Sequence, residues 1–133
     1  GNDTPSIQAE FVPSKLQNWP VQLHLLPLKA PYYKNANLLL AADCCAFAYG
    51  NFHAEFMTNR ITAIGCPKLD DTGAYLNKMA AIFANNDIET VTVAYMEVPC
   101  CMGIVKLAEE SIRLSGKDIP LKKVKIGIRG NLL

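Results

Sequence analysis

Hydrophobic residues along the chain form short runs that alternate with stretches of helical period. Five runs have the length and composition of strands. They span Val21–Leu26, Asn37–Ala42, Arg60–Gly65, Glu89–Val98 and Leu121–Ile128. The second run is continuously apolar, which is typical of a strand buried on both faces of a parallel sheet. The place of the first strand is open, because the proline-containing stretch 27–36 that follows it is typical of an irregular crossover.

Three stretches between these runs show the spacing of amphipathic helices. They are Cys45–Met57, the stretch between Asp71 and Asn85, and Cys100–Ser115. Gly50 and Asn51 weaken the first helix because both have low helix propensity. Asp70 and Asp71 are suited to cap the second helix, and Gly116 is suited to end the third in the left-handed conformation.

Strands that alternate with helices imply right-handed β–α–β crossovers and a parallel sheet covered on both sides. We therefore predict a three-layer Rossmann-like α/β sandwich with a mainly parallel sheet of four or five strands. No internal repeat or Gly/Ser-rich linker divides the sequence. We expect residues 15–133 to form a single α/β domain and residues 1–14 to be a leader, in which Gly1 is typical of a residue left by an expression tag.

The composition is that of a globular protein and limits its partners. Of the 133 residues, 50% are hydrophobic and 19% are charged, so apolar burial can offset the entropy lost on folding. The formal net charge of +1 argues against a nucleic-acid partner, which requires a basic face. The longest apolar stretch, Leu38–Tyr49, is interrupted by Asp43 and is shorter than the roughly 20 residues that cross a bilayer. We therefore expect no membrane span.

Five cysteines occur in three groups, Cys44–Cys45, Cys66 and Cys100–Cys101. An odd number of clustered thiols in an apolar chain is more typical of a reducing cytosol than of a secreted disulfide scaffold. We therefore expect a cytoplasmic protein whose thiols are free or metal-bound. Each group follows a predicted strand, and the carboxyl ends of parallel strands share one edge, where open α/β folds bind ligands. The thiols are therefore predicted to gather at that edge.

Several chemistries suit such a cluster. Four thiolates, from Cys44, Cys66, Cys100 and Cys101, are enough to hold zinc or an iron–sulfur cluster. Thiol–disulfide redox chemistry is an alternative, because Cys100 and Cys101 lie where a helix begins and the helix dipole there favours thiolate. A vicinal disulfide between these two residues is a further option. In the remaining interpretation the cysteines only pack, since a single cysteine is most often buried and inert.

Other polar residues carry weaker signals. His53 is a candidate metal ligand, but it lies two helical turns from Cys45, more than about 10 Å away, which favours a capping or surface role. His24, inside the first predicted strand, is expected to be a core or edge residue. Lys68 and Asp70 are expected at the same edge as the thiols, either tuning the charge of a cluster or forming a solvated loop and a helix cap.

Signatures of common enzyme classes are missing from the sequence. No G-x-G-x-x-G motif follows the first predicted strand, there is no P-loop, and no Ser, His and Asp set indicates hydrolysis. A dehydrogenase or a plain hydrolase is therefore disfavoured. The lysines at positions 117, 122, 123 and 125 are typical of the solvated face of an edge strand, and they also suit docking to an acidic electron carrier.

Five blocks of sequence, taken in order, carry a resemblance to a known family. They are residues 16–23 (LQNWPVQL), 39–44 (LLAADC), 50–53 (GNFH), 65–70 (GCPKLD) and 96–101 (MEVPCC). With these blocks the chain resembles the C-terminal domain of ferredoxin-like 4Fe-4S iron–sulfur proteins of anaerobic bacteria. The likeness extends from about Lys15 to the C-terminus.

The resemblance implies a role in electron transfer or redox maintenance. Family members place this domain after a ferredoxin module, so the implied partner is a ferredoxin module or another redox protein, and this chain is expected to be an excised domain or a stand-alone relative. The cysteines of the family match Cys44, Cys66, Cys100 and Cys101, whereas Cys45 is an additional one. We therefore expect a redox accessory domain that binds an iron–sulfur cluster, with zinc as the alternative. A non-catalytic docking domain and a thiol–disulfide enzyme are the competing hypotheses.

Overall fold

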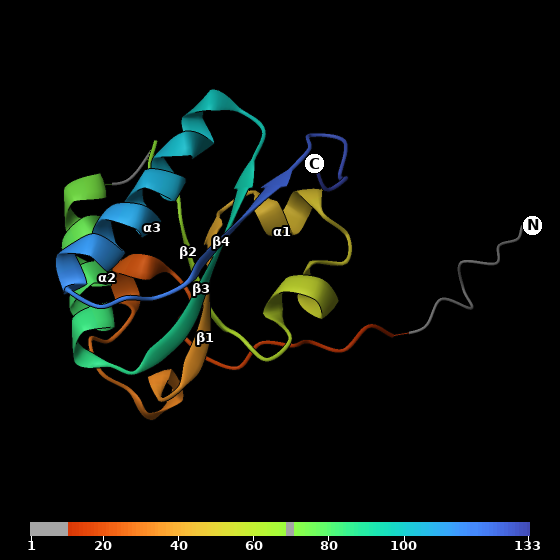
Figure 1. Cartoon of the computed structure of the whole chain (residues 1–133). Coiled ribbons are helices and arrows are strands. Elements are labelled where there is room, and N and C mark those ends of the chain that lie inside the picture. The colour runs from red at the N-terminus through yellow and green to blue at the C-terminus, as the bar shows by residue number, and fades with distance from the viewer. Residues whose placement is uncertain (1–10, 69–70) are drawn as a thin grey trace, which may run out of the picture.

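A four-stranded parallel sheet forms the middle layer of the structure (Figure 1). The computed structural model describes residues 11–68 and 71–133, with the side chain of Cys100 outside the description. The strands are β1 (Ala36–Ala42), β2 (Ile61–Gly65), β3 (Ile88–Met96) and β4 (Leu121–Ile126). Their order in the sheet is β2-β1-β3-β4, and every neighbouring pair is parallel.

Helices cover both faces of this sheet (Figure 1). The long helices α2 (Thr72–Asn85) and α3 (Met102–Ser115) pack against each other on one face. The short helix α1 (Cys45–Ala48) and a π-helical turn, η4 (His53–Met57), lie on the other face. This is the three-layer α/β sandwich predicted from the sequence, with four strands. None of the helices in the described ranges is long and apolar enough to cross a membrane.

The central strand β1 is buried on both faces, as its continuous apolar run predicts. Leu38, Leu39 and Leu40 are completely buried, although their side chains alternate between the two faces of the sheet. Helices α2 and α3 cover one of these faces, and α1 with η4 covers the other. The direction of β1 therefore fixes where its carboxyl end, and the loop that follows it, emerges from the sheet.

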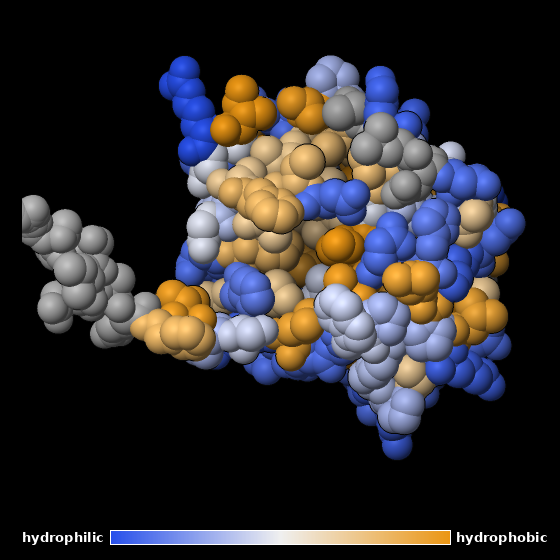
Figure 2. Space-filling model, turned by 180° about the vertical axis from the view of Figure 1, so that it is seen from behind, coloured by the Kyte–Doolittle hydropathy of each residue, from blue (hydrophilic) through white to orange (hydrophobic). Residues whose placement is uncertain are grey.

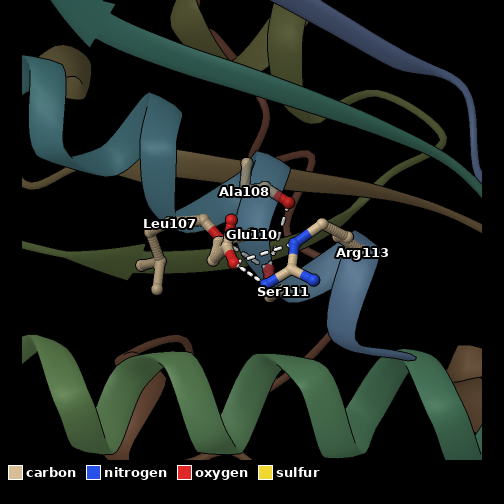
Figure 3. Close-up of polar contacts among 5 residues, drawn as sticks. All are labelled: Leu107, Ala108, Glu110, Ser111 and Arg113. Carbon is tan, nitrogen blue, oxygen red and sulfur yellow. Dashed lines mark hydrogen bonds and ion pairs between the residues drawn. The ribbon is translucent and has the colours of Figure 1, made fainter. Parts of the chain in front are cut away.

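Helix α3 shows how the sequence separates a buried face from an exposed one. Ser111 is completely buried, and its hydroxyl donates a hydrogen bond of 2.6 Å to the carbonyl of Leu107 (Figure 3). On the exposed side of the same helix Glu110 pairs with Arg113, and this hydrogen bond holds the pKa of the Glu110 carboxyl below its usual value. Gly116 ends the helix with φ +75°, as expected for a left-handed cap.

The ends of the other helices differ in part from the predictions. Asp71 caps α2 by accepting a 3.1 Å hydrogen bond from the amide of Ala74, as predicted, whereas Asp70 lies outside the described residues. The predicted helix Cys45–Met57 is wrong as one element, because the chain breaks at Tyr49–Asn51 between α1 and η4. This break coincides with Gly50 and Asn51, the positions of low helix propensity.

The predicted first strand, Val21–Leu26, is wrong. Gln22 forms one isolated parallel bridge with Ile64, and the chain then turns into the 3₁₀ helix η2 (Leu23–Leu25). The side chain of Gln22 caps this turn by accepting a 2.7 Å hydrogen bond from the amide of His24. His24 is consequently exposed, with its ring 4.3 Å from that of Tyr75, and it is not a core residue.

The outer edge of β2 is covered by the N-terminal segment. The side-chain amide of Asn18 donates a 2.9 Å hydrogen bond to the carbonyl of Thr62 and accepts one of 2.9 Å from the amide of Thr62. Asn18 is 5% exposed, so these bonds are shielded from water. Further along the edge, the amide of Ile64 donates to the carbonyl of Val21 at 2.8 Å. One asparagine side chain thus performs the pairing of a strand residue.

Replacement of Asn18 tests this edge. Asn18→Ala leaves the buried amide and carbonyl of Thr62 without their partner, and we expect a loss of about 1–3 kcal/mol in the free energy of unfolding. The neighbouring exposed residue Gln17 is the control, since Gln17→Ala should change that free energy little. Urea denaturation of both variants measures the difference. Equal stabilities would contradict the assigned role of Asn18.

Candidate functional site

A cavity of about 260 Å³ lies at the carboxyl edge of the sheet. We call it the thiol cavity, because Cys44, Cys66 and Cys101 line it together with Asp43. The rest of its wall is apolar and comes from Ala42, Pro67, Met96, Val98 and Ile128. In the view from behind, hydrophobic residues gather over part of the surface, with hydrophilic residues among and around them (Figure 2).

Each of the three cysteines reaches the thiol cavity from the end of a different strand. Cys44 follows β1, whose pairing with β2 is continued by a 3.1 Å hydrogen bond from the amide of Asp43 to the carbonyl of Gly65. Cys66 follows β2 directly and is partly buried. Cys101, also partly buried, ends the 3₁₀ turn η5 (Pro99–Cys101) after β3. The prediction that the thiols gather at one edge is confirmed for these three.

Two of these segments approach each other closely at Gly103 and Pro67. Gly103, in the first turn of α3, faces Pro67 so closely that a Cβ atom at position 103 would lie 3.1 Å from Cβ of Pro67. Few real Cβ contacts are that short, so a glycine suits this position. The contact places the start of α3 against the loop after β2, which brings Cys101 and Cys66 to the same cavity.

Cys45 has a different environment from its neighbour Cys44. The Cys45 side chain is completely buried in the hydrophobic core, whereas Cys44 is exposed. Burial, with a further contribution from the nearby Cys101, raises the pKa of the Cys45 thiol to about 12. Cys45 therefore stays protonated at neutral pH and acts as a small apolar side chain.

The donor chemistry of the thiol cavity suits thiophilic metals, since thiolates select soft ions and iron–sulfur clusters. In the described part of the chain, however, no three His, Cys, Asp or Glu side chains are already spaced as metal ligands. The fourth predicted ligand, Cys100, has its side chain outside the description. Metal binding would therefore require the described cysteine side chains to move from the positions that the structure gives them. The four-cysteine metal site stays a prediction.

The remaining candidate residues are not among the described residues that line the thiol cavity. His53 accepts a 3.1 Å hydrogen bond on Nδ1 from the amide of Lys15, so it anchors the N-terminal segment. Lys68 is exposed. Among the lysines near the last strand, Lys123 pairs with Glu109 at 2.7 Å and Lys117 donates to the carbonyl of Asn86 at 2.8 Å.

Two residues of the site were missed by the sequence analysis. Ile128, predicted as the end of a strand, lies beyond β4 and lines the thiol cavity. Glu97, for which the sequence suggests no role, accepts a 2.8 Å hydrogen bond on Oε2 from the amide of Ile128. The glycines at 127 and 130 are a sequence signal for a turn at this point, but no local signal connects that turn to Glu97.

Comparison with known proteins supports the assignment of the fold and assigns no chemistry to the site. Residues 30–133 match the family model of a Rossmann-like domain. The chain belongs to this Rossmann-like domain family. An uncharacterized protein of Archaeoglobus fulgidus is 29% identical over 116 residues, which cover 87% of this chain and 81% of the relative. No solved structure matches the chain significantly. The function of the domain is therefore argued from its site.

The raised pKa of Cys45 predicts a pH dependence of stability. Above pH 9 the unfolded chain releases this proton while the native chain keeps it up to a pKa of about 12, so the native state loses stability as the pH rises. We expect the difference in free energy of unfolding between the native sequence and Cys45→Ala to shrink by up to about 1.4 kcal/mol per pH unit in that range. Urea titrations under reducing conditions measure it. Parallel curves for the two proteins would contradict the assignment.

Proposed function

We propose that this Rossmann-like domain is a redox or electron-transfer accessory domain whose thiol cavity binds an iron–sulfur cluster or another thiophilic metal. One observation carries the proposal: Cys44, Cys66 and Cys101, which are distant in sequence, line one apolar cavity at the edge where open α/β folds bind ligands. Single cysteines that merely pack have no reason to converge in this way, and the packing role is already filled by Cys45.

The charges around the thiol cavity favour a metal over thiolates activated by the protein. No lysine, arginine or histidine is among the described residues that line the cavity, and Asp43 adds a carboxylate. A bound cation would lower the pKa of its thiols and neutralise their charge. A bound cluster would supply one-electron transfer. The apolar wall would limit the access of water to it.

The position of Cys44 suits exchange of electrons with a partner. Cys44 is exposed while Cys66 and Cys101 are partly buried, so Cys44 is the most accessible of the three cavity thiols. The partner in this proposal is a ferredoxin module or another redox protein, in a cytoplasmic setting that keeps thiols reduced. The resemblance of this chain to the C-terminal domain of ferredoxin-like iron–sulfur proteins supports this choice of partner.

Thiol–disulfide exchange is the second candidate function. It requires two sulfur atoms, and no described group of three or more ligands is already spaced for a metal. In this reaction two cavity thiols lose two electrons and two protons to form a disulfide, while a disulfide of the partner protein is reduced to two thiols. The same thiol cavity serves both hypotheses, so metal content decides between them.

Metal analysis of the full chain, purified without oxygen, tests the proposal. We expect bound iron with acid-labile sulfide, or bound zinc. The substitutions Cys44→Ser, Cys66→Ser and Cys101→Ser should each lower the metal content several-fold, because each removes a cavity thiol. Cys45→Ala is the matched control, since the buried Cys45 does not line the cavity and its loss should leave the metal in place.

The opposite outcomes are equally distinct. Metal-free protein with easily alkylated cavity thiols would contradict the metal proposal. A metal content that is the same in all four variants would also contradict it. Metal-free protein whose cavity thiols titrate reversibly as a dithiol would establish the second candidate. If neither metal nor reversible oxidation were found, the cysteines would have a packing role in a docking domain.

A further inference from the structure

We propose that Ile128 determines the size of the molecules that reach the thiol cavity, and that Glu97 is the positioning residue that holds Ile128 there. The proposal rests on the proposed function in one respect, since it takes the cavity sulfurs as the reactive groups of the site. It assigns a role to the turn that follows β4.

The turn that carries Ile128 is fixed by backbone hydrogen bonds. The amide of Gly127 donates to the carbonyl of Asn131 at 2.7 Å, and the amide of Gly130 donates to the carbonyl of Gly127 at 2.9 Å. Beyond the turn, the chain returns along β4, where Leu132 forms an antiparallel bridge with Ile126. These hydrogen bonds and the bridge hold the backbone of the turn in one conformation, and Ile128 has a defined place in it.

At two glycines the turn packs closely against neighbouring residues. A Cβ atom at Gly127 would lie 2.5 Å from Oδ1 of Asn131 and 3.0 Å from Oε2 of Glu97. Gly130 has φ +83°, and a Cβ atom there would lie 2.7 Å from the carbonyl oxygen of Ala48 in α1. The turn thus sits against α1, the helix that starts next to Cys44.

Glu97 joins the turn to the strand that forms part of the thiol cavity. Met96 and Val98, the neighbours of Glu97, both line the cavity. The Glu97 carboxylate accepts the 2.8 Å hydrogen bond from the amide of Ile128, and the Glu97 amide donates to the carbonyl of Ile126 at 2.9 Å. A hydrogen bond to a charged acceptor is stronger than a neutral one, so Glu97 ties the amide of Ile128 to the wall of the cavity.

Ile128 lies at the mouth of the thiol cavity. Its side chain lines the cavity although the residue is 67% exposed, whereas Met96 in the same wall is 7% exposed. An isoleucine side chain is stiff at χ1, so it is a fixed obstacle to a bulky molecule. Small molecules pass beside it to Cys66 and Cys101. Truncation at position 128 should therefore widen the opening without removing a core residue.

Alkylation of reduced, metal-free protein with a small and a bulky maleimide tests this role. N-ethylmaleimide and pyrenyl maleimide are compared, and labelling at each cysteine is followed by peptide mass spectrometry. We expect Ile128→Ala to raise the rate of pyrenyl labelling at Cys66 and Cys101 roughly tenfold, because labelling follows the population of accessible sulfur. The rate with N-ethylmaleimide should change much less.

Internal controls separate a wider opening from general loosening of the fold. Cys44 is already exposed, so its labelling should be similar in both proteins, and the buried Cys45 should stay unlabelled in both. Arg129→Ala changes an exposed residue of the same turn that does not line the cavity, and it should behave like the native sequence. Labelling of Cys45 in Ile128→Ala would mean that the fold had loosened, and it would overturn the proposal.

Glu97 is tested by a pair of substitutions. Glu97→Ala removes the acceptor for the Ile128 amide and should raise pyrenyl labelling in the same way as Ile128→Ala. Glu97→Gln keeps an oxygen acceptor and should restore most of the protection, which a loss of charge alone would not predict. Unchanged pyrenyl labelling in Ile128→Ala, or equal labelling in the two Glu97 variants, would refute the inference. Because the protein is metal-free, neither result depends on the metal analysis.

Discussion

The parallel pairing of β1 with both of its neighbours is the constraint on which the site depends. Near its carboxyl end β1 pairs with β2 at Ala42 and Gly65, and with β3 at Ala41 and Ala94. Three strands that run in the same direction must release the chain at the same edge. The thiol cavity is a consequence of this geometry, because a cysteine follows each of the three strands at or soon after the point where it ends.

Burial then divides the cysteines into two chemical classes. Cys45 belongs to the core and its thiol pKa is raised, while Cys44 is exposed one residue earlier. Because adjacent residues at the start of a helix point in different directions, the chain can use one thiol for packing and present the next to the thiol cavity. Cys45 therefore serves as the reference residue for experiments on the cavity thiols.

Much of the fold, and the location of the site, could be predicted from local sequence. The apolar run of β1 and the cap at Asp71 are local signals that the structure confirms. The prediction of a strand at Val21–Leu26 was wrong because the alternation of residues suggested a period of two. In the structure Leu23 and Leu26 are buried at a spacing of three residues, at a 3₁₀ turn. The bond from Ile128 to Glu97 joins positions 31 residues apart, so no local pattern reveals it.

The central claim is that sulfur atoms from three strand ends bind the same metal ion or cluster. X-ray absorption spectroscopy at the metal edge of anaerobically purified protein tests it most directly, because the fine structure reports the type and distance of the ligand atoms. The account predicts a shell dominated by sulfur at about 2.3 Å. A shell made of nitrogen and oxygen atoms, or no bound metal at all, would contradict it.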